Sequence, residues 1–129
     1  MNEEEKKDLR LRTKAFALRI IRLYAVLLKT TEAQVLGRQL LRSGTSVGAH
    51  HREATRARST AEFVSKIEGG LQELEETAYW LELLGEAEIV QEARLVSLRE
   101  ETEELTAMLV ASVRTAKKLN KKYSTTSEE

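Results

Sequence analysis

Apolar residues recur at spacings of three and four through four long segments of the chain, which has 129 residues and no proline. Such spacing gathers apolar side chains on one side of an α-helix, and proline is the residue that breaks helix interiors. The pattern predicts helices over about 6–29, 32–57, 60–84 and 88–122, the third one stopped by a left-handed Gly85. Short turns between long helices make neighbours antiparallel. We therefore expect an all-α fold, an antiparallel up-and-down four-helix bundle with a long C-terminal helix. It forms a single domain over residues 1–129, with frayed tails at about 1–5 and 123–129.

The composition of the chain bears on the cellular compartment in which we expect it. The chain has no cysteine, which removes disulfides and thiolate metal sites and makes a reducing compartment the expected one. Its first 30 residues are too charged for a secretory signal, and no apolar run is long enough to span a membrane. We expect a cytoplasmic protein with no membrane partner.

The first predicted helix is apolar on two opposite faces. One stripe consists of Leu9, Phe16, Ile20, Leu23 and Leu27. The other consists of Leu11, Leu18, Ile21, Ala25 and Leu28. A helix that is apolar on two faces must be covered on both, and a bundle of this size covers only one. The second stripe therefore predicts a homo-oligomer interface, to which we also assign His50, His51 and Trp80.

The second predicted helix keeps glycines in its interior, each at a cost of about 1 kcal/mol relative to alanine. Its predicted inward seam is Leu36, Leu40, Ser43, Val47, His50 and Ala54, beside a strip that contains Gly37, Gly44 and Gly48. Bare backbone is useful where another helix approaches closely. If the second and third helices fold back at residues 58 and 59, Gly48 lies level with Gly69. We expect close helix packing at Gly44, Gly48, Gly69 and Gly70.

The formal net charge of zero hides two oppositely charged halves. Residues 6–58 hold thirteen Lys and Arg against three Asp and Glu, and residues 59–113 hold three against thirteen. Spaced guanidinium groups suit phosphate oxygens. The candidate nucleic-acid-binding residues lie on the outer face of the second helix and on the first, and they are Arg38, Arg42, Arg52, Arg56, Arg19 and Arg22. Basic side chains at Arg10, Arg12 and Lys14 adjoin them. The alternative is that acids such as Glu62, Glu73 and Glu76 neutralise the arginines within the protein.

The sequence offers little for catalysis. His50 and His51 are adjacent, so on a helix their side chains diverge by about 100° and cannot share a metal as an i, i+4 pair does. The glutamate clusters lie largely off the apolar seams, and no nucleophile or orienting group converges on either imidazole. We expect no catalytic residue, no metal and no cofactor.

Several stretches between residues 14 and 90 resemble the bacterial four-helix-bundle proteins encoded within intervening sequences of large-subunit ribosomal RNA genes. The most specific is 39–49 (QLLRSGTSVGA), and the others are 14–24, 52–54, 56–59, 61–63 and 76–84. The resemblance implies a ring-like homopentamer. The related accessory variability proteins of diversity-generating retroelements form pentamers with a basic surface, and they bind nucleic acid and a reverse transcriptase. This chain departs from the pattern at His50-His51, where Asn-Tyr is usual.

Together these features favour a non-enzymatic homo-oligomer, with a pentamer favoured by the resemblance, that presents a basic surface to RNA or to a reverse-transcriptase-like nucleoprotein partner. The alternative is a purely structural adaptor whose arginines form ion pairs and bind no nucleic acid.

Overall fold

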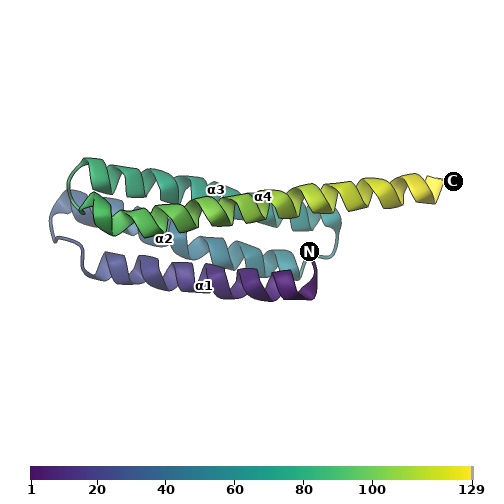
Figure 1. The fold of residues 1–129 in the computed structure, drawn as a ribbon, viewed down its shortest axis with the longest axis horizontal. Helices are drawn as coiled ribbons and strands as arrows, with labels where there is room; N and C mark the ends of the chain where they lie inside the picture. The colour runs from purple at the N-terminus through teal and green to yellow at the C-terminus, as the bar shows by residue number, and fades with distance from the viewer. Residues whose placement is uncertain (129) are drawn as a thin grey trace.

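The structure is a computed structural model that describes the backbone of residues 1–128 and the side chains of residues 1–122. It contains the helices α1 (Glu3–Ala25), α2 (Thr31–Thr55), α3 (Thr60–Glu86) and α4 (Glu92–Glu128). The chain runs back and forth, so the N-terminus and the α2–α3 turn share one end of the molecule and the other two turns share the opposite end (Figure 1). The predicted all-α four-helix bundle is confirmed.

Short polar side chains fix where the first three helices begin. The Asn2 side chain accepts a hydrogen bond from the Glu5 backbone N–H at 2.8 Å, and the Glu5 carboxylate reaches back to the Asn2 backbone. This reciprocal cap starts α1 at Glu3, three residues before the predicted Lys6. Thr30 and Ser59 cap α2 and α3, because each side chain accepts a hydrogen bond from the backbone N–H three residues later, at Ala33 and Glu62.

The end of α3 differs from the expected one. Gly85 lies inside the helix rather than stopping it, and the left-handed residue is Glu88, with a φ of 59°. A side chain at Gly85 would collide with the Glu92 carboxylate and the Arg99 guanidinium. Gly85 is therefore used for close packing between α3 and the start of α4, not for a turn.

The core holds the predicted inner stripe of α1, since Leu9, Phe16, Ile20, Leu23 and Leu27 are all buried. The seam of α2 differs from the predicted one. Its buried residues recur at alternating spacings of four and three, and they are Ala33, Gly37, Leu40, Gly44, Val47, His51 and Ala54, together with Ser43. Leu36 and His50 are only half-buried. Gly37 and Gly44 of the glycine strip thus belong to the seam, and Gly48 is half-buried beside it.

The glycines of α2 face α1. A Cβ at Gly44 would meet Ile20, one at Gly48 would meet Thr13, and one at Gly37 would meet Leu27 and Tyr24. The expected contact between Gly48 and Gly69 is wrong, because the ring of His50 fills the space beside Gly69. Gly70 instead approaches Leu109 of α4 at an ordinary contact distance.

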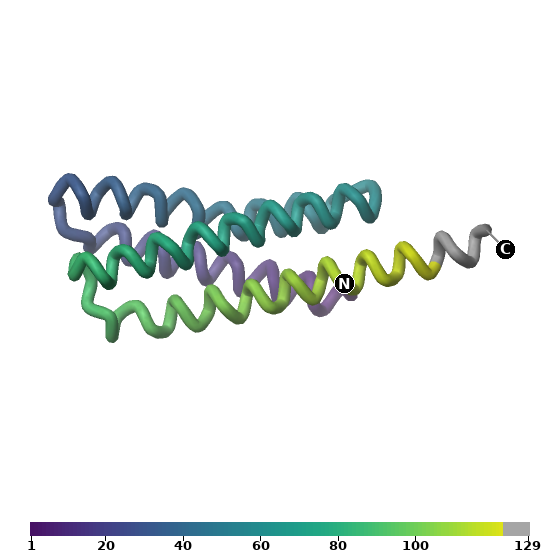
Figure 2. Tube along the Cα trace, turned by 90° about the horizontal axis from the view of Figure 1, so that it is seen from above, coloured from purple at the N-terminus to yellow at the C-terminus, as the bar shows by residue number. Residues whose placement is uncertain are grey.

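The four helices do not contact one another equally. The pairs α2–α3, α1–α2 and α3–α4 pack along their lengths, whereas α1 and α4 approach each other only slightly. The long α4 runs past the end of the other helices (Figures 1 and 2). The tail predicted from Tyr123 onward continues α4 in its backbone to Glu128, and its side chains lie outside the described residues. None of the described helices is both long and apolar enough to cross a bilayer.

Candidate anion-binding surface

An arginine stripe, defined as Arg38, Arg42, Arg52 and Arg56, runs along the side of α2 opposite its buried seam. All four residues are exposed. Their spacing of four, ten and four residues keeps them on one face of a helix. The buried seam of α2 occupies the other side of the helix, so the side that carries the arginine stripe faces solvent.

One member of the stripe is neutralised within the protein. The Arg42 guanidinium pairs with Glu73 at 3.1 Å and with Glu76 at 2.7 Å, both on α3. Arg38, Arg52 and Arg56 have no acidic partner among the side chains that the structure describes. The alternative of internal ion pairing therefore holds for Arg42 alone within the stripe.

Two of the basic residues of α1 contact α4. Arg12 binds Glu101 and Glu104 of α4, the latter at 2.7 Å, and Arg19 donates to the Ser97 hydroxyl of α4 at 2.7 Å. These two side chains thus brace the slight α1–α4 contact and lie apart from the arginine stripe. Arg22 is exposed.

A cleft lies where the first two turns of α1 meet the last turn of α2. We call it the basic cleft; it has a volume of about 380 Å³. Its lining residues are Glu3, Lys6, Lys7, Arg10, His51, Arg52 and Thr55. Four cations thus face a single carboxylate, and that carboxylate, on Glu3, is 93% exposed and pairs with Lys6 at 3.4 Å. The cleft joins the stripe to α1 through Arg52.

His51 closes the inner side of the basic cleft. His51 is only 1% exposed, and both of its ring nitrogens are buried without a hydrogen-bond partner among the described residues. Burial lowers the pKa of His51 below its ordinary 6.5, and the nearby charges of Arg52 and Arg10 lower it further. The imidazole is therefore neutral at pH 7, with one N–H to donate. A buried polar group left unpaired costs about 1–3 kcal/mol.

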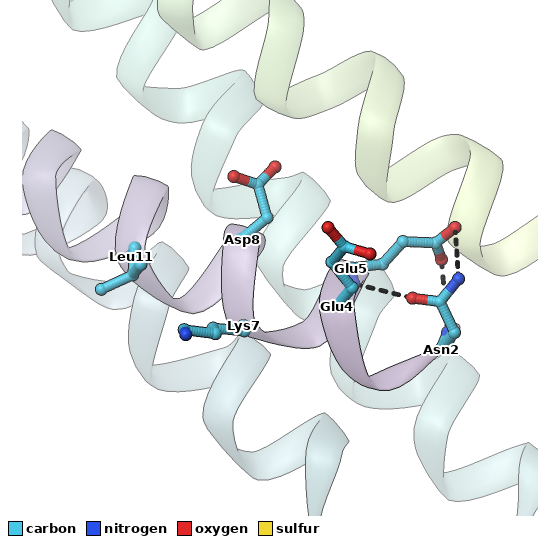
Figure 3. A pocket seen from close by; sticks show the side chains of 6 residues that line it. All are labelled: Asn2, Glu4, Glu5, Lys7, Asp8 and Leu11. Atoms are coloured by element: carbon cyan, nitrogen blue, oxygen red, sulfur yellow. Dashed lines mark hydrogen bonds between the residues drawn. The ribbon is translucent and has the colours of Figure 1, made fainter.

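A second hollow lies elsewhere, on the outer face of the first turns of α1, and has a volume of about 530 Å³. Figure 3 shows its wall, where the carboxylates of Glu4, Glu5 and Asp8 stand beside Lys7 and the Asn2 cap. Acidic walls repel anions. No group of three or more metal-ligating side chains gathers within the described part of the chain. Of these two hollows, the basic cleft is the one whose charge suits an anionic ligand.

The residues expected at an oligomer interface fall into two groups. Leu11, Leu18 and Ile21 of α1 and Leu28 of the following loop stay between 39% and 57% exposed. His51 is wrong as an interface residue, because the shifted seam of α2 encloses its ring within the protomer. His50 is half-buried over Gly69, and Trp80 is half-buried with its ring 5.2 Å from that of Tyr79.

Sequence reasoning missed Lys6, Lys7 and Thr55 as neighbours of Arg52. The signal was present in part, since Lys6, Lys7 and Arg10 lie on one side of the first three turns of α1. Only the antiparallel register of α1 and α2 brings that side against the last turn of α2.

The comparisons with known proteins agree with this fold. The family model described as 23S rRNA-intervening sequence protein matches residues 5–111. A similar solved structure is that of a protein of unknown function from the S23 ribosomal protein family of Bacteroides thetaiotaomicron VPI-5482. It is 35% identical, the match covers 85% of this chain and 98% of that chain, and the TM-score is 0.80. The comparison with curated proteins gave no match.

Proposed function

Since this chain belongs to the family of 23S rRNA-intervening sequence proteins, we propose that it is a non-catalytic, self-associating helical bundle that presents a basic face to RNA. The observation that carries the proposal is that three of the four arginines of the stripe are exposed and unpaired with acids among the described side chains. Arg38, Arg52 and Arg56 are exposed and have no acidic partner among the described side chains, although the chain has as many acids as bases. Cations left unpaired on one face supply the sequence-independent part of nucleic-acid binding.

The outer apolar stripe that begins on α1 supports the proposed self-association. Leu11, Leu18 and Ile21 on α1, with Leu28 just after it, are large apolar side chains that the described protomer leaves between 39% and 57% exposed. Exposed apolar surface of this kind marks association sites on proteins. We propose that a second copy of the chain covers this stripe and that the assembly is a homopentamer, as the resemblance implies.

RNA binding is tested by fluorescence anisotropy with a labelled single strand over a salt series. We expect the logarithm of the affinity to fall linearly with the logarithm of the salt concentration, by about 0.7 per phosphate contact. The double variant Arg38→Ala with Arg56→Ala should weaken binding and make that slope shallower. Arg94→Ala, at the start of α4 and at the opposite end from the basic cleft, is the charge-matched control. An RNA affinity that changes neither with salt concentration nor in the double variant would overturn the proposal.

Self-association is tested by light scattering. The wild-type protein should scatter as a multiple of its 14.6 kDa protomer. Leu18→Glu should shift it toward the protomer, because a buried carboxylate in an apolar contact is costly. Val96→Glu, which adds the same charge at another exposed apolar position, on α4, is the control. A wild-type protein that scatters as a single protomer would contradict this part of the proposal.

A structural adaptor is the second candidate, and the Arg42 pairs with Glu73 and Glu76 favour it. If the whole stripe serves such pairs between subunits, Arg38→Ala and Arg56→Ala would loosen the assembly in light scattering while the wild-type protein binds no RNA. The two measurements above therefore separate the candidates.

A further inference from the structure

We propose that the basic cleft between α1 and α2 binds a phosphate dianion, carried on the end of an RNA strand or taken up as free phosphate. The RNA source rests on the proposed function, whereas phosphate binding itself stands on the geometry of the cleft alone.

The charges of the cleft set the class of ligand. Lys7, Arg10 and Arg52 line it from two helices, and none of the three has an ion-pair partner among the described side chains. Elsewhere on the same bundle, Arg12 and Arg42 each hold two carboxylates. Two guanidinium groups that line one cleft and have no ion-pair partner among the described side chains are suited to the oxygens of a phosphate, which arginine binds in bidentate fashion.

His51 supplies the second and independent observation. Its ring is almost wholly buried at the inner side of the cleft, and neither nitrogen has a hydrogen-bond partner within the described residues. A neutral imidazole has one N–H donor, and a phosphate oxygen held between Arg10 and Arg52 would accept from it. Buried polar groups in native proteins are nearly always paired, so the unpaired ring points to a ligand group that completes it.

The remaining polar side chain of the cleft is already used. The Thr55 hydroxyl donates to the Arg52 backbone carbonyl at 2.8 Å, which leaves its oxygen without a proton to offer an anion. Glu3 pairs with Lys6 at the exposed rim and so leaves Lys7 and the arginines uncompensated. The surplus of cations over the one acid matches a group with two negative charges better than an internal phosphodiester, which carries one.

The first experiment uses inorganic phosphate and the whole protein. Phosphate is titrated while the ring nitrogens of His51 are followed by ¹⁵N NMR, with chloride at equal ionic strength as the reference. We expect a saturating shift of the His51 ring signals. Arg10→Ala and Arg52→Ala, both at exposed positions, should each weaken the binding about tenfold or more, whereas Arg94→Ala should not change it. No shift at His51, or equal affinity in all four proteins, would overturn the inference.

The second experiment distinguishes the sources with one short RNA that ends in a 5′-phosphate or in a 5′-hydroxyl. Tighter binding of the phosphorylated strand, lost in Arg10→Ala, assigns the cleft to an RNA end. Inorganic phosphate that binds while both strands bind equally assigns it to free phosphate. Phosphate binding without any RNA binding would leave the cleft in place and overturn the proposed function, whereas RNA binding without a phosphate effect at His51 would do the reverse.

Discussion

Gly44 of α2 lies so close to Ile20 of α1 that a Cβ on the glycine would come within 2.8 Å of the Ile20 Cγ1 atom. Ile20 is fully buried and β-branched, so it has little freedom to move aside. We expect Gly44→Ala to lower the free energy of unfolding by about 1–2 kcal/mol, because overpacking outweighs the gain in helix propensity. Urea denaturation followed by circular dichroism measures this change.

Gly70 of α3 offers the opposite case. A Cβ there would meet Leu109 at 3.4 Å, an ordinary contact distance, and the residue has no positive φ. Gly70→Ala should therefore raise the free energy of unfolding by up to about 1 kcal/mol through helix propensity. The same denaturation experiment serves both variants. If Gly70→Ala were as destabilising as Gly44→Ala, the contrast in local space would not govern these sites.

Ser43 and Thr77 form a buried hydroxyl pair between α2 and α3, with their oxygens 2.8 Å apart. Replacing Thr77 by valine leaves the Ser43 hydroxyl with one long contact, 3.4 Å to the Leu40 carbonyl. We expect Thr77→Val to cost about 1–2 kcal/mol, because a buried polar group loses its partner. The double variant with Ser43→Ala should cost less than the sum of the single variants, which a double-mutant cycle measures. Additive losses would show that the hydroxyls do not act as a pair.

The buried imidazole of His51 makes stability depend on pH. Burial lowers its folded-state pKa below the 6.5 of the unfolded chain, so the unfolded chain binds the proton more readily. Stability from this residue is complete above pH 6.5 and is lost as the pH falls below it, by at most about 1.4 kcal/mol per pH unit. The difference between wild type and His51→Gln in unfolding free energy should shrink between pH 7 and pH 5. A difference that stays constant would contradict a buried neutral ring.

Arg12 is the main link between α1 and α4. Its guanidinium lies between Glu101 and Glu104, whose hydrogen bonds and charges raise the pKa of Arg12 above its ordinary range. Arg12→Ala should lower the free energy of unfolding by about 1 kcal/mol at low salt and by less at 1 M salt, since partly exposed ion pairs are screened. Arg22→Ala, exposed on the same helix, should change little. A loss from Arg12→Ala that is equal at both salt concentrations would point to packing of its alkyl chain instead.

Sequence periodicity predicted those features of the fold that are set within single helices, such as their approximate extent and the buried face of α1. The inner stripe of α1 from Leu9 to Leu27 is buried as expected, and the helices follow one another antiparallel as their short turns require. A stripe of large apolar residues has only one low-energy place in a bundle, which is why this level of structure follows from spacing.

What spacing missed depends on two helices together. On α2 the small residues Gly37 and Gly44 count as core positions, because α1 lies directly against them, and hydrophobicity alone gives glycine no such role. Moving the seam toward them buries His51 and leaves His50 half-buried beside Gly69 of α3. Likewise, only the register of α2 against α3 decides that Arg42 meets Glu73 while Arg38 and Arg56 meet no described acid.

The C-terminal part of α4 gives this electrically neutral protein an uneven charge along its length. Lys117, Lys118, Lys121 and Lys122 follow one another at the end where α1 begins and α2 stops. Together with the cations of the basic cleft they outnumber the acids of the first turns of α1, even though Lys117 pairs with Glu68, while Glu82, Glu86 and Glu88 gather where α3 finishes. A rod charged unequally at its tips turns in the field of a polyanion before contact. Approach to any highly negative polymer would therefore be oriented, tip first, and faster in dilute buffer than in concentrated salt.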